Sequence, residues 1–115
     1  MKIYLAIPYS NCEEESFRVS NEIALKLINQ GNIVYSPISM CHVLNQSLLI
    51  SGWKNWEKQD KAFIEWCDVV MVIILKDNGL YKIDKSEGVK AEMSYANRLN
   101  KKIIFIDEMT YTAQK

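Results

Sequence analysis

The sequence carries no excess of charge of either sign. Fourteen Lys and Arg residues balance fourteen Asp and Glu residues, so the formal net charge at pH 7 is 0. Proteins that bind the phosphate backbone of a nucleic acid polymer, or an anionic membrane surface, commonly present an excess of basic residues. The balance of charge therefore argues against both kinds of partner.

Long hydrophobic runs are also absent. The longest, residues 69–75, covers about a third of the roughly 20 residues that span a bilayer. Residues 1–2 lead directly into a short apolar segment rather than into the apolar region of a signal peptide. We therefore expect a cytoplasmic protein, and the length of 115 residues predicts a single domain that covers 1–115.

Cysteine and histidine are scarce. Cys12, Cys41 and Cys67 are odd in number and widely spaced, which excludes a complete disulfide framework and a paired CxxC site. We interpret them as reduced structural thiols. A zinc site that joins Cys41 and His42 to Cys12 or Cys67 is an alternative, but adjacent ligands do not match the usual spacing. We predict no metal and no cofactor, and we interpret His42 as an ordinary loop histidine.

Glycine-rich motifs are missing as well. The sequence contains neither GxGxxG nor GxxxxGK[ST], which argues against the two commonest nucleotide-binding loops. It also lacks GxSxG, the strand-turn-helix motif that presents a nucleophilic serine in many hydrolases. The four glycines are scattered along the chain, at Gly31, Gly52, Gly79 and Gly88.

Hydrophobic periodicity predicts alternating strands and helices. The predicted strands are 3–7, 33–35, 69–75 and 103–106, and the predicted helices are 13–30, 56–67 and a helix capped by Ser86 that reaches residue 100. Gly31 is expected to end the first helix in the left-handed conformation. The segment 37–55 has mixed periodicity, which indicates a loop with a short helical piece.

This alternation is typical of an α/β protein in which helices cover both faces of a mostly parallel sheet. The simplest arrangement is a three-layer, flavodoxin-like sandwich with four strands in the order 2-1-3-4. In such sheets, ligands bind beyond the carboxyl ends of the strands where the strand order reverses. The sequence therefore predicts a site built from residues 7–10, the loop 77–86 and the start of the last helix.

Glu92 is the acid that this arrangement singles out. It lies beside the apolar stripe predicted for the last helix, formed by Val89, Met93, Ala96 and Leu99. A carboxylate turned toward the sheet, near the positive end of the helix dipole, suits the nucleophile of glycosyl transfer through a covalent sugar intermediate. The alternative is an ordinary solvated glutamate on a helix surface.

Other candidate residues also allow two interpretations. Ser86 and Gly88 fall where free backbone amides could hold an oxyanion or a phosphate, but Ser86 could simply cap the helix. Tyr4 and Tyr9 could place a hydroxyl near the nucleophile or could be core and rim residues. The tryptophans before and at the start of the second predicted helix could stack on a base or cover the sheet edge; these are Trp53 and Trp56.

Three blocks of sequence together resemble the nucleoside 2-deoxyribosyltransferase superfamily over almost the whole chain. The first is IYLA at 3–6 followed by PYS at 8–10. The second is Asp60, eight residues before the segment DVVMV at 68–72. The third is SEGVKAEMSYA at 86–96, which contains a serine and a glycine ahead of a Glu-x-x-Tyr-Ala-like helix.

The resemblance implies a role for each matching residue. Glu92 corresponds to the nucleophile that attacks C1′ of deoxyribose, Asp60 to the residue that assists or contacts the departing base, and Tyr4 to a tyrosine that orients the nucleophile. Ser86 matches the serine of relatives that hydrolyse deoxynucleoside 5′-monophosphates, where it helps to hold the phosphate. The expected substrate contacts are Pro8, Tyr9, Ser10, Ser86 and Gly88.

The resemblance also implies a homodimer or higher homo-oligomer, since family members usually complete each site with residues from a neighbouring subunit. No such residue can be named in this chain. The segments 37–56 and 76–85 are closer to small relatives, often phage-borne, than to the well-studied enzymes.

The leading hypothesis is cleavage or transfer at the N-glycosidic bond of a deoxynucleoside or its 5′-monophosphate, with water or a second base as acceptor. Two alternatives stay open. One is a non-catalytic module that binds a nucleotide-derived ligand in the same crevice. The other is cleavage of the nicotinamide-ribose bond of NAD.

Overall fold

The computed structural model describes residues 1–9, 11–48, 53–75 and 86–107, and contains a parallel sheet of four strands. The strand order is β2-β1-β3-β4, and every neighbouring pair is parallel. In chain order the elements are β1 (Lys2–Ala6), α1 (Glu13–Asn29), β2 (Ile33–Tyr35), α2 (Pro37–Leu48), α3 (Trp53–Trp66), β3 (Val69–Ile74), α5 (Glu87–Arg98) and β4 (Lys102–Asp107). The predicted fold class and strand order are confirmed.

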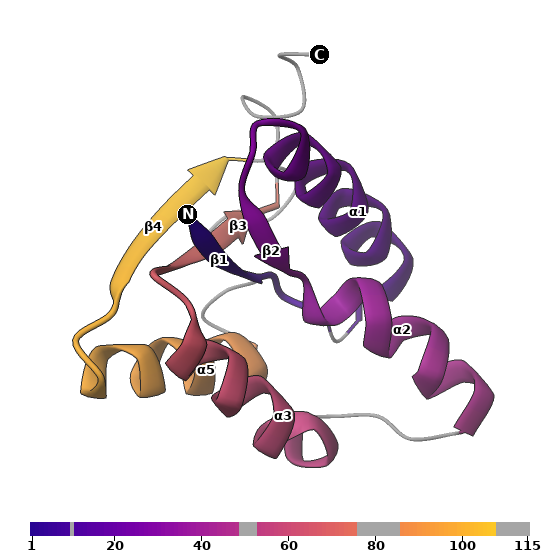
Figure 1. The fold of residues 1–115 in the computed structure, drawn as a ribbon. Coiled ribbons are helices and arrows are strands. Elements are labelled where there is room, and N and C mark those ends of the chain that lie inside the picture. The colour runs from indigo at the N-terminus through magenta and orange to yellow at the C-terminus, as the bar shows by residue number, and fades with distance from the viewer. Residues whose placement is uncertain (10, 49–52, 76–85, 108–115) are drawn as a thin grey trace.

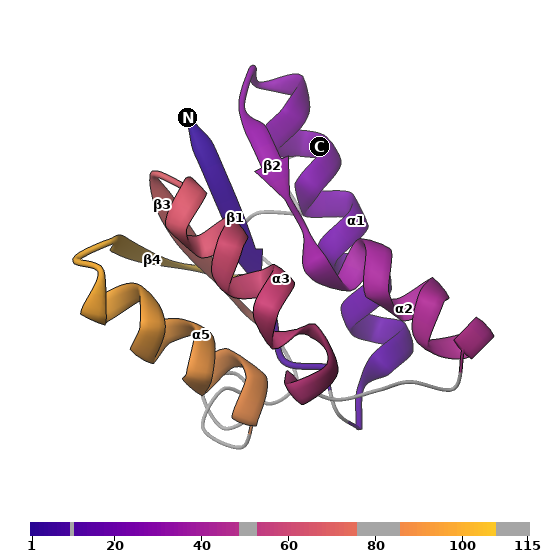
Figure 2. The same cartoon turned by 60° about the horizontal axis from the view of Figure 1, so that its bottom comes forward.

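Helices cover the sheet on both faces, so the molecule has three layers (Figure 1). α1 packs on one face, with α2 beside it, and α3 and α5 lie together on the other face, as Figure 2 shows. β3 is buried along nearly its whole length, as expected for a central strand covered on both sides. The apolar run 69–75 therefore forms the middle of the protein.

The alternation of side chains along β1 divides the core in two. Ile3 and Leu5 face α1, where they join an aliphatic cluster that includes Val19 and Ile23. Tyr4 and its neighbours on the opposite face join a second cluster, formed with Ala6, Ile64, Cys67, Val70, Val72, Val89 and Ala96. Because successive residues of a strand point to opposite faces, one strand supplies both clusters.

The ends of α1 follow the chemistry of the sequence. Three acids, Glu13, Glu14 and Glu15, occupy the first turn and Lys26 the last, which complements the helix dipole. Gly31 has φ of 95°, so the predicted left-handed residue after the helix is confirmed.

The segment 37–55 departs from the prediction of a loop with a short helical piece. α2 forms a twelve-residue helix from Pro37, and α3 already begins at Trp53. Proline is favoured in the first turn of a helix because its missing N–H has no partner to lose there. The apolar residues Val43 and Leu44 are exposed on the outer side of α2, and they obscure the helical period in the sequence.

Two single-residue predictions are also corrected. His42 is not a loop residue but lies in α2, where it is buried. Leu99, predicted in the buried stripe, is the exposed residue that follows the last turn of α5. Within the described part of the chain, no helix is both long and apolar enough to cross a membrane.

Candidate active site

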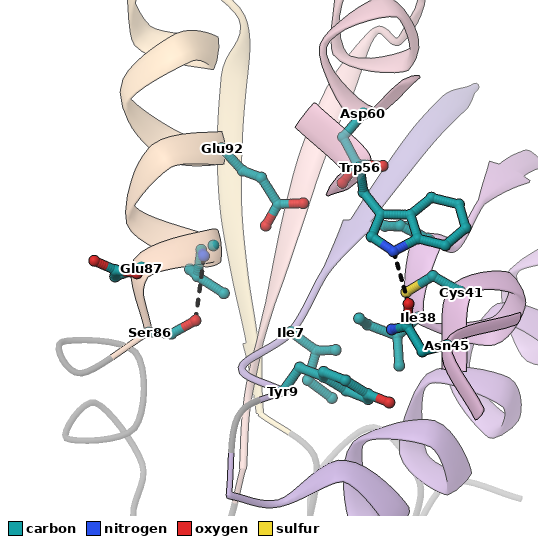
Figure 3. A pocket seen from close by; sticks show the side chains of 13 residues that line it. Ile7, Tyr9, Ile38, Cys41, Asn45, Trp56, Asp60, Ser86, Glu87 and Glu92 are labelled. Carbon is teal, nitrogen blue, oxygen red and sulfur yellow. Dashed lines mark hydrogen bonds between the residues drawn. The ribbon is translucent and has the colours of Figure 1, made fainter. Parts of the chain in front are cut away.

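A pocket opens beyond the carboxyl ends of β1 and β3, at the place where the strand order reverses (Figure 3). Its cavity volume is about 120 Å³, far more than the roughly 10–15 Å³ that one water molecule needs. The residues that line it come from the end of β1, α2, α3 and the start of α5: Ile7, Tyr9, Pro37, Ile38, Cys41, Asn45, Trp56, Asp60, Ser86, Glu87, Gly88, Val89 and Glu92. The space is large enough for a ligand.

Glu92 projects from α5 into this pocket, as Figure 3 shows. Only 6% of its surface is exposed, so it is not a solvated helix glutamate. The hydroxyl of Tyr4, which is fully buried on β1, donates a hydrogen bond to Glu92 Oε2. Tyr4 does not line the pocket itself but holds the carboxyl group of Glu92 from behind.

Asp60 faces the same space from α3 (Figure 3). It is 4% exposed, and its Oδ1 atom has no hydrogen-bond partner among the described residues. A buried oxygen without a partner is costly, and such atoms in a pocket commonly await a donor from a ligand. Asp60 is therefore suited to receive or deliver a proton, or to bind an N–H group.

Burial changes the acidity of both carboxyl groups. It raises the pKa of Asp60 to about 7, against hydrogen bonds from Tyr35 and Tyr4 that lower it. It raises the pKa of Glu92 to about 8, where the hydrogen bond from Tyr4 lowers the pKa and the charge of Asp60 raises it further. Burial and the two nearby carboxyl groups also raise the pKa of Tyr4, which keeps its hydroxyl protonated as a donor.

The helix dipole contributes little to this site. Glu92 lies in the second turn of α5, whereas the favourable effect of a helix N-terminus fades after the first turn. The ionised form of Glu92 therefore depends mainly on Tyr4.

The start of α5 forms a third side of the pocket. Ser86 caps the helix, because its side-chain oxygen accepts a hydrogen bond of 3.2 Å from the backbone N–H of Val89. The hydroxyl hydrogen is still available to a ligand, since the oxygen acts as acceptor in the cap. A Cβ atom at Gly88 would meet nothing within 4 Å, so this position leaves the pocket open.

Only some of the predicted substrate contacts in the segment after β1 line the pocket. Tyr9 lines the pocket, and its hydroxyl lies 2.6 Å from His42 Nδ1. Pro8 is buried outside the pocket lining, and its carbonyl oxygen accepts hydrogen bonds from Ser16 Oγ and Cys12 Sγ. Ser10 and the loop 76–85 lie outside the described residues, as does the side chain of Trp53.

Sequence reasoning missed the contribution of α2. Cys41 and Asn45 line the pocket, and Trp56 Nε1 donates a hydrogen bond of 2.9 Å to Asn45 Oδ1. Burial and two nearby carboxyl groups raise the pKa of Cys41 to about 12, so its thiol stays protonated and is unsuited as a nucleophile. The sequence does contain a pattern that predicts this side of the pocket. Ser36-Pro37 is typical of a helix start, and Ile38, Cys41 and Asn45 follow at helical spacing.

Tyr35 and Gln59 were also missed. Tyr35 on β2 is the register partner of Tyr4 on β1, and their ring centroids lie 5.7 Å apart. Gln59 Nε2 donates a hydrogen bond of 2.7 Å to the Tyr35 hydroxyl. Tyr35 in turn stacks on Phe63 with ring centroids 3.8 Å apart. Together these contacts hold the side of the site next to Asp60.

Among the described residues, no three His, Cys, Asp or Glu side chains are grouped as ligands for the alternative zinc site. Cys41 faces the pocket, whereas Cys67 donates a hydrogen bond of 3.1 Å to the carbonyl oxygen of Ile64.

Comparison with known families identifies the family of this chain. The model of a domain of unknown function, DUF1937, matches residues 1–108. The chain belongs to the DUF1937 family. No curated protein matches this DUF1937 chain significantly.

Two solved structures resemble the DUF1937 chain. The CMP N-glycosidase BcmB from Clostridium botulinum superposes with a TM-score of 0.59 at 19% identity, over 93% of this chain and 71% of its own length. A 2-desoxiribosyltransferase from Leishmania mexicana gives a TM-score of 0.61 at 17% identity, over 92% of this chain and 63% of its own length. The predicted resemblance to the deoxyribosyltransferase superfamily is thus confirmed at the level of the fold.

Proposed function

We propose that this DUF1937 protein cleaves or transfers the N-glycosidic bond of a deoxynucleoside or a deoxynucleoside 5′-monophosphate. The observation that carries the proposal is the pair of buried carboxyl groups, Glu92 and Asp60, which face one pocket with Tyr4 hydrogen-bonded behind Glu92. Burying two acids together is costly, and such pairs are typical of active sites that move protons and form glycosyl intermediates.

In the proposed reaction, Glu92 is the nucleophile and Asp60 the proton donor. A carboxylate oxygen of Glu92 forms a bond to C1′ of the sugar while the bond from C1′ to the base nitrogen breaks. The base leaves with the electron pair of that bond and takes a proton from Asp60. The product of this step is a glycosyl ester on Glu92.

The second step releases the sugar. Water or a second base attacks C1′ and breaks the ester, which returns the carboxylate to Glu92. Asp60, now ionised, takes the proton that the attacking group loses. Hydrolysis and transfer thus differ only in which molecule occupies the place of the departed base.

The reactive state holds one proton on the pair, with Glu92 ionised and Asp60 protonated. Because the two pKa values are raised to about 8 and about 7, the pair holds one proton mainly between these pH values. Because the pKa of Asp60 is the lower of the two, the shared proton lies mainly on Glu92, and the reactive form with the proton on Asp60 is the minor arrangement of the singly protonated pair. The hydrogen bond from Tyr4 stabilises an ionised Glu92 and so supports that reactive form. We therefore expect kcat/KM to be highest in this range and to fall on both sides.

The start of α5 supports a substrate that carries a 5′-phosphate. The Ser86 hydroxyl and the first backbone N–H groups of α5 are the donors that a phosphate oxygen requires. The fold is shared with an enzyme named as a CMP N-glycosidase, which makes nucleotides a natural first test. A free nucleoside would fill the same pocket without using these donors.

The test is chromatographic detection of free base after incubation with deoxynucleosides, their 5′-monophosphates, CMP and NAD. Base release that disappears in Glu92→Gln, together with a sugar adduct on the intact protein detected by mass spectrometry, would support the proposal. Release of nicotinamide alone would favour the NAD alternative. No release from any compound, with thermal stabilisation by one of them, would favour a binding module and contradict the proposal.

A further inference from the structure

His42 is a buried titratable group that the proposed reaction does not use. It is 4% exposed and does not line the pocket. A buried imidazole carries two ring nitrogens, and each needs a hydrogen-bonding or charged partner to offset the loss of water. The contacts of these nitrogens therefore indicate what the residue does.

Both nitrogens of His42 have partners, and the partners come from different segments. Nδ1 lies 2.6 Å from the hydroxyl of Tyr9, which follows β1. Nε2 lies 3.4 Å from Glu14 Oε1 on α1. The ring also stacks on Phe17 of α1, with centroids 4.4 Å apart and an interplanar angle of 25°. His42 thus joins α2 to α1 and to the pocket-lining tyrosine.

The chemistry of the two partners decides which ring nitrogen of His42 donates a hydrogen bond and which accepts one. A carboxylate only accepts hydrogen bonds, so Glu14 favours the proton of a neutral imidazole on Nε2. Nδ1 then carries the lone pair, and the Tyr9 hydroxyl donates its hydrogen to it. The side chain of Asn45 hydrogen-bonds to Tyr9, and this contact lowers the Tyr9 pKa against the larger effect of burial, which raises it.

These contacts form a chain that ends in one wall of the pocket. Trp56 donates to Asn45, and Asn45 contacts Tyr9, which His42 anchors. Figure 3 shows Tyr9, Asn45 and Trp56 together, across the pocket from Ser86. All three line the cavity, whereas His42 stands behind them. His42 is therefore placed to fix the shape of this wall.

We propose that His42 is a positioning residue that fixes the Tyr9 side chain in the wall of the pocket and thereby sets how tightly substrate binds. The part that concerns substrate rests on the proposed function. His42 acts through Tyr9, and it does not line the pocket into which Glu92 and Asp60 face. Its loss should therefore raise KM and leave kcat nearly unchanged.

A double-mutant cycle tests this inference. His42→Phe keeps a flat ring against Phe17 but removes both nitrogens, and Tyr9→Phe removes only the hydroxyl. Each change is expected to raise KM about three- to tenfold, the effect of one hydrogen bond, with kcat within about twofold. The double variant should raise KM no more than Tyr9→Phe alone. Effects that multiply, or a fall in kcat at unchanged KM, would overturn the proposal.

A second measurement needs no substrate. His42 is the single histidine of the chain, so long-range ¹H–¹⁵N NMR spectra report on this ring alone. We expect the proton on Nε2 and a slowly exchanging Tyr9 hydroxyl proton that is lost in both Tyr9→Phe and His42→Phe. A proton on Nδ1, or spectra unchanged by Tyr9→Phe, would refute the positioning role. Intact spectra in a protein that cleaves nothing would instead refute only the proposed function.

Discussion

The two faces of the sheet differ in chemistry although the same strands build both. On the α1 face, β1 and β3 present aliphatic side chains such as Ile3, Leu5 and Ile73 to a dry core. On the α3 and α5 face, Tyr4 of the same strand contacts Glu92 within reach of the pocket. Alternation along one strand therefore separates a stabilising surface from a reactive one.

The α3 and α5 face, which we call the reactive face, lowers the stability of the fold. It buries two carboxyl groups whose pKa values are raised by that burial, and one oxygen of Asp60 has no partner in the described residues. The α1 face compensates with hydrophobic burial, worth about 25 cal/mol per Å² of apolar surface. Substitutions on the α1 face should consequently change the free energy of unfolding, whereas substitutions on the α3 and α5 face should change the kinetic constants.

The largest effect is expected from Glu92→Gln on the reactive face. Removal of the proposed nucleophile should lower kcat at least about a thousandfold, because the amide of glutamine cannot form the glycosyl ester. The free energy of unfolding at pH 8 should not fall, since the amide need not be ionised in a buried place. Steady-state kinetics and urea unfolding measure the two quantities. Glu22→Gln on α1 is the control: it should leave kcat unchanged and lower the free energy of unfolding by no more than about 0.5 kcal/mol, the worth of an exposed i,i+4 ion pair such as that with Arg18. A Glu92→Gln protein that retains activity would contradict the assignment of the reactive face.

Leu5→Ala tests the opposite face. Leu5 is fully buried against α1, and the cavity left by truncation should cost about 2–5 kcal/mol of the free energy of unfolding. The residue points away from the pocket, so KM and kcat of the folded protein should stay within about twofold of the wild type. Urea unfolding would measure the free energy of unfolding, and steady-state kinetics below the unfolding midpoint would measure KM and kcat. A large change in KM with little loss of stability would show that the faces are not independent.

Tyr4→Phe alters the residue next to Leu5 on the reactive face. The ring remains, but the hydrogen bond to the Glu92 carboxylate is lost, which should reduce kcat/KM about 10- to 100-fold. The Tyr4 hydroxyl lowers the pKa of both Glu92 and Asp60, so its loss should move both limbs of the pH profile to higher pH. A pH profile of kcat/KM measures both effects. An unshifted profile would mean that Tyr4 does not govern the ionisation of the carboxyl pair.

A further prediction concerns the pH dependence of stability. The pKa values of Asp60 and Glu92 rise from 3.8 and 4.5 to about 7 and about 8, so the folded protein binds these protons more tightly than the unfolded chain. The contribution to stability is therefore full below about pH 4 and is lost as pH rises toward 8. Urea unfolding across this range should give a shallower slope for Glu92→Gln than for the wild type. Leu5→Ala should keep the wild-type slope.

The fold could be predicted from the sequence because its main signals are local. The apolar run 69–75 and the helical spacing in 13–30 depend only on neighbouring residues. The break before Pro8 and the glycine at Gly31 mark where two elements end. The α2 helix was missed because Val43 and Leu44 expose apolar side chains to solvent, which disguises its period.

The site was predicted in part, for a related reason. Glu92 was identified because its place beside an apolar stripe is local information. The contact between Tyr9 and His42 joins residues 33 positions apart, and the pairing of Tyr4 with Tyr35 depends on strand register. Neither distance nor register can be read from one sequence by periodicity. Long-range polar contacts are accordingly what the structure adds.

The pocket draws on residues from β1 to α5, and this has a consequence for synthesis on the ribosome. Tyr4 is made before its partner Glu92, which lies 88 positions later. Chains fold as they emerge, from the N-terminus. Until α5 has left the exit tunnel, the Tyr4 hydroxyl lacks the Glu92 carboxylate, and Asp60 has no facing acid to share a proton with. A nascent chain that stops before α5 therefore lacks the carboxyl pair, which forms only once α5 has been translated.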